Sequence, residues 1–122
     1  MARRHRILII DDSRETVVGL KAYLGKKYHV MTAYNGRDGI KKYDKNEGRI
    51  DLILTDLILP DAIGRCLISS IKKKTPEKPV IAMTGWEGDP AEEFETNSNA
   101  DLVLKKPFEL EQLDQAIEKF LS

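Results

Sequence analysis

Six side chains that could do chemistry lie where short apolar segments of the chain end. Three are carboxylates, one is a hydroxyl and two are ammonium groups. Each alone has an ordinary explanation, because an aspartate after a strand is usually a turn residue or a helix cap, and threonine favours strands. The same six groups gathered at one edge of a sheet would be much stronger evidence of a functional site. They are Asp11, Asp12, Asp56, Thr84, Lys105 and Lys106.

The three carboxylates decide which chemistry this set could perform. Like charges at close range disfavour ionisation, so a cluster of ionised aspartates needs a counter-charge. Mg²⁺ suits oxygen ligands, and the set contains no cysteine or histidine that would favour zinc. With the cation in place, one aspartate could attack phosphorus while a lysine and a threonine neutralise the transferring oxygens. These residue types therefore predict Mg²⁺-dependent phosphoryl transfer to an aspartate.

Apolar segments alternate along the chain with segments of helical periodicity. This alternation predicts five βα units: an α/β fold with a parallel sheet, helices on both faces and right-handed crossovers. Ligands of such sheets bind outside the carboxyl ends of the strands, where the six groups lie. The expected strands are 6–10, 28–33, 51–55, 79–84 and 102–104. Helices are expected over 13–25, between an Asn35-Gly36 turn and residues 46–48, over 65–74, from 89 onward and over 109–121.

The first and last of these helices have clear apolar positions. In the first helix they are Val17, Val18, Leu20, Ala22 and Leu24, and in the last helix Leu110, Leu113, Ile117, Phe120 and Leu121. We expect these side chains to face the sheet.

Composition excludes several broad classes of function. The chain has 122 residues, enough for one domain, and its 20 basic and 20 acidic side chains leave no net charge to favour nucleic acid. Lys72-Lys73-Lys74 is expected to be a solvated helix end. The single Cys66 fits a reducing compartment and is expected to be a small buried residue. No apolar run approaches the about 18 residues of a membrane span, so the expected location is the cytoplasm.

The order and spacing of four motifs resemble the receiver domain of two-component response regulators. These motifs are "ILIIDDS", "DLILTDLILPDAIG", "IAMTG" and "KKPF". The resemblance covers residues 1–122 as a single domain. It implies a flavodoxin-like, doubly wound (βα)5 sandwich with the strand order 2-1-3-4-5.

The resemblance also implies a role for each site residue. Asp56 would accept a phosphoryl group from a histidine kinase or a histidine phosphotransfer protein. Mg²⁺ would be bound directly by Asp12, largely through water by Asp11, and by the backbone carbonyl of Ile58. Thr84 would contact the phosphoryl oxygens, Lys106 would pair with the acceptor site beside a cis bond to Pro107, and Lys105 would be solvated. The output domain or downstream partner is not implied, and relatives commonly form homodimers through their fourth and fifth helices.

Three positions depart from the family pattern. Val103 stands where relatives usually carry tyrosine or phenylalanine, so we expect activation to be signalled through residues 84–90, including Gly85, and the helix that follows. Ile58 and Trp86 lie two residues past the acceptor and the threonine. Neither side chain can position a water molecule, so we expect slow loss of the phosphoryl group. Trp86 is equally well interpreted as a partner-facing aromatic.

Two other classes use related features. A small Mg²⁺-dependent phosphatase with an aspartyl phosphate would need an acid or base where Ile58 stands. A binding module on the same fold, such as a flavin protein, would need a phosphate-cradling loop after the first strand, where the acid pair would repel phosphate. The sequence also leaves open whether the domain stands alone or forms part of a longer regulator.

Overall fold

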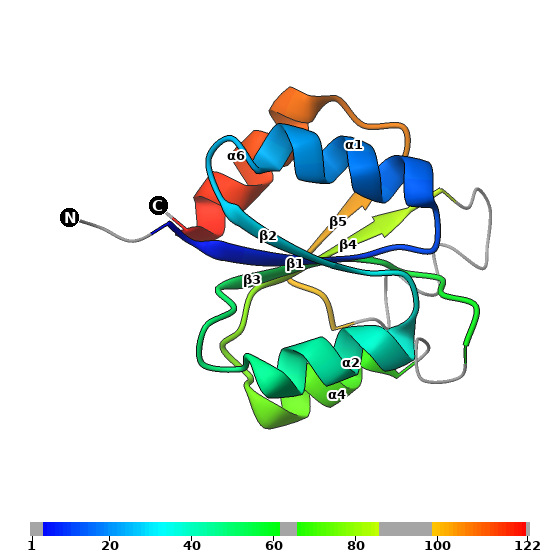
Figure 1. Ribbon diagram of the computed structural model, residues 1–122, viewed down its shortest axis with the longest axis vertical. Coiled ribbons are helices and arrows are strands. Elements are labelled where there is room, and N and C mark those ends of the chain that lie inside the picture. Colours follow the sequence, from blue (N-terminus) through cyan, green and yellow to red (C-terminus); the bar gives the residue numbers. More distant parts are fainter. Residues whose placement is uncertain (1–3, 62–65, 86–98, 122) are drawn as a thin grey trace.

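Five parallel strands form a central sheet in the computed structural model, which describes residues 4–61, 66–85 and 99–121 (Figure 1). The strand order is β2-β1-β3-β4-β5, which confirms the order implied by the resemblance. All strands are parallel, but β2 lies on one side of β1 and β3 on the other, so the strand order reverses between β1 and β3. Ligands of doubly wound folds bind at this point. The strands are β1 (Arg6–Ile10), β2 (His29–Ala33), β3 (Leu52–Asp56), β4 (Val80–Thr84) and β5 (Leu102–Lys105).

Helices cover both faces of the sheet, as predicted. Figure 1 shows α1 (Arg14–Leu24) and α6 (Leu110–Leu121) on one face and α2 (Gly36–Lys45) and α4 (Leu67–Lys74) on the other. Successive strand residues point to opposite faces, so a strand covered on both sides must be apolar throughout. Residues 7–10 of β1 and all of β4 are accordingly buried.

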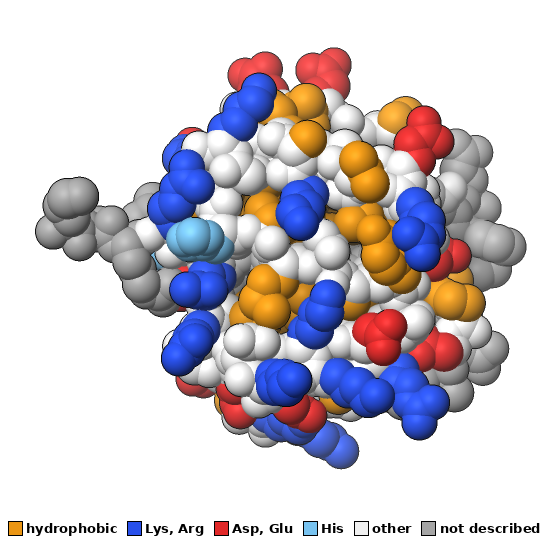
Figure 2. Space-filling model, in the orientation of Figure 1, with side chains coloured by type: hydrophobic (Ala, Val, Ile, Leu, Met, Phe, Trp, Pro, Cys, Tyr) orange, Lys and Arg blue, Asp and Glu red, His pale blue; other side chains and the backbone are white. Residues whose placement is uncertain are grey.

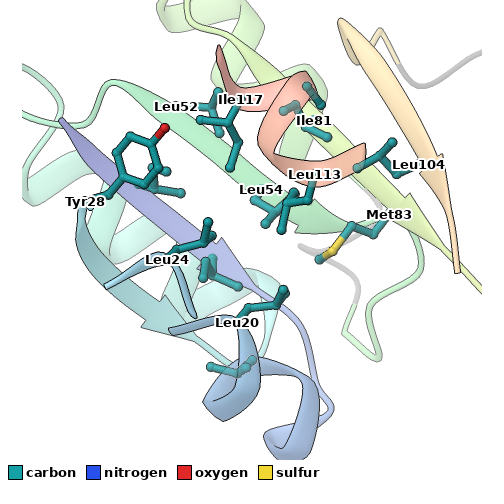
Figure 3. Close-up of a cluster of buried hydrophobic side chains, with 14 residues drawn as sticks. Leu20, Leu24, Tyr28, Leu52, Leu54, Ile81, Met83, Leu104, Leu113 and Ile117 are labelled. Atoms are coloured by element: carbon teal, nitrogen blue, oxygen red, sulfur yellow. The ribbon is translucent and has the colours of Figure 1, made fainter. Parts of the chain in front are cut away.

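Two separate hydrophobic clusters hold the helices to the sheet. Ile7 and Ile9 belong to the cluster under α1 and α6, whereas Leu8 and Ile10 belong to the cluster under α2 and α4. Gly39 allows α2 to approach β1 closely, because a Cβ atom there would lie 2.7 Å from Cδ1 of Ile10. Figure 3 shows the first cluster, in which helix residues Leu20, Leu24, Leu113 and Ile117 surround Leu52, Leu54, Ile81 and Met83 of the strands.

Three sequence expectations about the helices are wrong in detail. Asn35-Gly36 is not a free turn, because Asn35 caps α2 and its side chain accepts a hydrogen bond from the Asp38 amide. Val18 and Leu110 are 62% and 43% exposed, since α1 and α6 pack on the sheet through narrower stripes. These stripes consist of Val17, Leu20 and Leu24 in α1, and of Leu113, Ala116 and Ile117 in α6.

The expectations for Cys66 and Lys72 also need correction. Cys66 is exposed, because it precedes α4 and the buried face of that helix begins at Leu67. Lys72 is not simply solvated: its side chain is 16% exposed, and Nζ lies 2.6 Å from Oδ2 of Asp101. Trp86, Pro90 and the helix expected from residue 89 lie outside the described residues.

The surface charge is uneven although the formal net charge is zero. Figure 2 shows the face formed by α1, β2 and α2, where Lys and Arg side chains are spread among apolar ones. Within residues 14–45, the basic side chains are Arg14, Lys21, Lys26, Lys27, Arg37, Lys41, Lys42 and Lys45, and the acidic ones are Glu15, Asp38 and Asp44. Among the described residues, no helix is long and apolar enough to cross a membrane.

Candidate functional site

The carboxyl ends of four adjacent strands bring the candidate residues together. Asp11 directly follows β1, Asp56 ends β3, Thr84 ends β4 and Lys106 directly follows β5. The strand register keeps these ends nearly level, since Ile10 pairs with Thr55, Asp56 with Met83 and Thr84 with Lys105. The sheet therefore places at one edge the groups that are far apart in sequence.

Three carboxylates form the centre of this edge. Asp11, Asp12 and Asp56 each offer an oxygen atom, and these atoms lie within 4.8 Å of one another. Asp11 is fully buried, Asp12 is exposed, and the Asp56 side chain is 13% exposed. An all-oxygen donor set of this size fits a hard divalent cation such as Mg²⁺ and not a cation that prefers nitrogen or sulfur.

Both oxygens of Asp11 have protein partners. Oδ1 accepts a hydrogen bond of 2.9 Å from the amide of Ser13, and Oδ2 accepts one of 2.7 Å from Nζ of Lys106. Ser13 is the N-cap of α1, and its own side chain accepts from the Thr16 amide. The start of α1 therefore fixes the buried carboxylate while Asp12 remains open to solvent.

Lys106 supplies the positive charge of the site. Its Nζ lies 2.7 Å from Oδ2 of Asp11 and 3.5 Å from Oδ2 of Asp56. Burial lowers the pKa of Lys106, but the hydrogen bond to Asp11 and the charges of both aspartates outweigh burial, so its pKa is raised. The Lys106–Pro107 bond is cis, as the resemblance implies, and the Lys106 amide donates to the Thr84 carbonyl over 2.7 Å. The side chain is therefore held as an ammonium between two carboxylates.

The surroundings of Asp56 act on its ionisation in both directions. Burial raises the pKa of Asp56, and the charge of Asp11 adds to this effect. The Ile58 amide, which donates to Oδ1 over 3.1 Å, and the Lys106 ammonium lower it. Burial prevails, so the pKa of Asp56 lies above its usual range. Asp56 therefore combines partial burial, a fixed orientation and an adjacent cation, which suits a carboxylate that reacts in a protected site.

The remaining predicted residues lie in or directly after β4 and β5. Thr84 is 1% exposed, and Gly85 packs against the Lys106 side chain, since a Cβ atom at Gly85 would meet its Cδ at 3.7 Å. Lys105 is exposed, as expected. Val103 is partly buried and packs against the cluster under α2 and α4.

Asp61 is a residue at this edge that sequence reasoning missed. Its Oδ1 and Oδ2 accept hydrogen bonds from the amides of Gly36 and Arg37, each over 2.9 Å. These amides belong to the first turn of α2, 25 and 24 residues earlier in the chain. An acidic residue after a proline gives no signal of so distant a helix partner.

This chain is similar to a receiver-domain family model, to a transcriptional regulator and to a sensor kinase. The family model described as the response regulator receiver domain matches residues 7–118. The transcriptional regulatory protein CiaR of Streptococcus pneumoniae is 33% identical over 118 residues, covering 95% of this chain and 51% of that protein. The sensor kinase CckA of Brucella abortus is 26% identical, covering 94% of this chain and 12% of that protein. The chain thus spans about half or less of the length of these curated relatives.

Solved structures give the same result. A response regulator receiver domain protein from Clostridium thermocellum superposes with a TM-score of 0.86 at 30% identity, covering 96% of this chain and 94% of that chain. A CheY-like receiver domain protein from Methanospirillum hungatei gives 0.84 at 29% identity, covering 96% and 93%. The similarity therefore extends over nearly the whole length of all three chains.

Proposed function

The chain belongs to the response regulator receiver domain family, and from this premise we propose that Asp56 is the residue that accepts a phosphoryl group. Accepting a phosphoryl group is typical of the family. One observation carries the assignment to Asp56: this carboxylate ends β3 beside the acid pair, with its Oδ2 3.5 Å from Nζ of Lys106. We take residues 1–122 as one such domain, whose role is regulatory.

The proposed reaction is a nucleophilic attack by Asp56 on phosphorus. One carboxylate oxygen forms the new P–O bond while the bond from phosphorus to the donor breaks. With a phosphohistidine donor, the P–N electron pair returns to the imidazole, which takes up a proton from water. With acetyl phosphate, the leaving group is acetate. The product in both cases is an acyl phosphate on Asp56.

Other residues would stabilise the charge that moves in this step. The Ile58 amide holds one oxygen of Asp56 in place. Lys106 would shift its second contact from the carboxylate to a transferring phosphoryl oxygen, and the Thr84 hydroxyl would donate to another. Asp11, which is bonded to both Ser13 and Lys106, would keep the lysine in position.

The donor set also supports a role for Mg²⁺. Asp12 is the exposed carboxylate of the cluster and would bind the ion directly, whereas Asp11 would act largely through water. Asp56 and the Ile58 carbonyl would complete the protein ligands. When bound, Mg²⁺ supplies positive charge to the phosphoryl oxygens and offsets the repulsion among the carboxylates.

The phosphodonor we propose is a histidine kinase or a histidine phosphotransfer protein. The curated relatives include sensor kinases and transcriptional regulatory proteins, which supports a place between a kinase and an output. The proposed location is the cytoplasm, where such a donor would present its phosphohistidine. We also propose that the chain forms homodimers, as relatives in this family commonly do.

Acetyl phosphate with Mg²⁺ tests the assignment directly. Intact-mass analysis should show one added phosphoryl group on the wild-type protein and none on Asp56→Asn. Asp44→Asn is the matched control, because it removes an exposed carboxylate on α2 and should be phosphorylated normally. A full phosphoryl gain in Asp56→Asn would contradict the proposal. Continuous turnover of acetyl phosphate with no accumulated adduct would favour the phosphatase.

A further inference from the structure

The carboxylate of Asp61 joins the loop after Asp56 to the first turn of α2. Its two oxygens each accept one hydrogen bond of 2.9 Å, from the amides of Gly36 and Arg37. Two bonds to separate oxygens fix the rotation of the carboxylate as well as its position. The amides at a helix N-terminus also carry partial positive charge, which favours an anion there. The contact is therefore a firm attachment of the loop to α2.

The described part of this loop, residues 57–61, is also anchored close to Asp56. The Leu57 amide donates to the Met83 carbonyl over 2.7 Å, and the side chains of Leu57 and Leu59 are buried. Ile58 lies between these anchors, and its amide donates to Oδ1 of Asp56 over 3.1 Å. Ile58, whose amide bonds to Asp56, thus lies in a segment that is held at Leu57 and Leu59 and again at Asp61.

We propose that Asp61 is a positioning residue for the phosphoryl site. By holding residues 57–61 against α2, it sets the place of Ile58, whose amide orients Asp56 and whose carbonyl is a proposed Mg²⁺ ligand. The inference rests on the proposed function for its Mg²⁺ readout, but the attachment of the loop is tested independently of the ion.

The chain offers a matched control on the same helix turn. Asn35 Oδ1 accepts a hydrogen bond of 2.8 Å from the Asp38 amide, so Asn35 also satisfies an amide of the first turn of α2. Its side chain bonds within residues 35–38 and makes no bond to the described loop residues 57–61. Asn35→Ala and Asp61→Ala should therefore weaken the start of α2 similarly, whereas only Asp61→Ala releases the loop.

Two measurements separate positioning from simple helix capping. The first is Mg²⁺ affinity by calorimetry for the wild type, Asp61→Ala, Asp61→Asn and Asn35→Ala. The second is hydrogen exchange of the Ile58 amide in the metal-free proteins. Asp61→Ala should weaken Mg²⁺ binding about 10-fold, the lower end for loss of a residue that orients metal ligands, and should speed Ile58 exchange. Asp61→Asn, which keeps one acceptor oxygen, should be intermediate. Asn35→Ala should match the wild type in both readouts.

Equal effects of Asp61→Ala and Asn35→Ala on both readouts would overturn the proposal, because Asp61 would then be only a helix cap. Unchanged Mg²⁺ affinity in Asp61→Ala would overturn it as well. If the wild type binds no Mg²⁺, the metal role in the proposed function fails, and Ile58 exchange alone decides whether Asp61 holds the loop. If Asp61→Ala does not fold, Asp61→Asn is compared with the wild type and Asn35→Ala in the same two measurements.

Discussion

Lys106 lies close to two of the three carboxylates of the site. It contacts the fully buried Asp11 and the partly buried Asp56, and these contacts keep its pKa raised in spite of burial. Loss of this lysine would leave Asp11 buried with no adjacent cation among the described residues, which is far more costly than loss of a surface charge.

Lys106→Met should therefore lower the free energy of unfolding by about 3 kcal/mol without Mg²⁺, the low end for breaking a buried pair, since Lys106 is 26% exposed. It should also slow phosphorylation by acetyl phosphate. Urea denaturation measures the first effect and adduct formation the second. Lys105→Met is the control, because Lys105 is exposed, and it should change neither. Equal behaviour of the two variants would show that the ion pairs are unimportant.

The backbone and the side chain of Ile58 have different roles at the site. Its amide binds Asp56, while its side chain is 37% exposed and has no group that could orient a water molecule. We predict that Ile58→Asn shortens the lifetime of the phosphorylated protein, because the new amide can hold water near the acyl phosphate. Decay after removal of acetyl phosphate measures this, with Ile58→Val expected to decay like the wild type. Identical decay of the asparagine variant would contradict slow hydrolysis by lack of water positioning.

At the scale of elements, α6 shows how narrow a helix contact stripe is. Leu113 is fully buried against the sheet, whereas Leu110, one turn earlier, is 43% exposed. Leu113→Ala should lower the free energy of unfolding by about 3 kcal/mol through lost burial and a cavity. Leu110→Ala should cost less than about 0.5 kcal/mol. Thermal or urea unfolding of the two variants tests this, and equal losses would mean that α6 packs through a wider face.

The pair α2 and α4 is linked by a buried tyrosine. Burial raises the pKa of Tyr43, although the hydrogen bond of 2.7 Å to Thr75 Oγ1 opposes this effect. Because the pKa of Tyr43 is higher in the folded state than in the unfolded state, its protonated phenol contributes fully to stability below the unfolded pKa of about 10. This contribution is lost as the pH rises through the folded pKa.

Tyr43→Phe should be less stable than the wild type at neutral pH by about 1 kcal/mol, because it loses the bond to Thr75. This difference should shrink as the pH rises above about 10, since only the wild type must ionise a buried phenol. Urea unfolding of both proteins across this range provides the measurement. A constant difference would show that Tyr43 does not contribute to alkaline instability.

Sequence patterns predicted the strands, and the gathering of the candidate residues at one edge of the sheet, better than they predicted helix surfaces. Continuous apolar runs such as residues 7–10 identify strands buried on both faces, and parallel strands bring their carboxyl ends to one edge. Helical periodicity does not reveal how wide the contact stripe is, so Val18 was wrongly placed toward the sheet. The role of Asp61 depends on a contact across 25 residues, which no local pattern records.

At the scale of the whole molecule, the site is expected to couple ion binding to folding. A ligand that binds only the folded chain at 100 times its dissociation constant adds about 2.7 kcal/mol to the free energy of unfolding. We predict this gain for Mg²⁺ with the wild-type protein. Asp12→Ala should lose most of it while keeping its metal-free stability, because Asp12 is exposed. Thermal unfolding with and without Mg²⁺ tests the prediction. If Asp12→Ala kept the full gain in stability from Mg²⁺, Asp11 and Asp12 would be only turn and helix-cap residues and not metal ligands.

The ion pair between Asp11 and Lys106 spans 95 residues of chain, from the end of the first strand to just past the last. During translation, the acid pair leaves the ribosome long before the lysine that balances it. A nascent or truncated chain that stops before β5 would contain both acidic strand ends but no adjacent ammonium group. Such a chain would be a poor phosphoryl acceptor even if its other strands had formed. The placement of Lys106 thus makes the proposed phosphoryl acceptance depend on synthesis of the chain as far as Lys106.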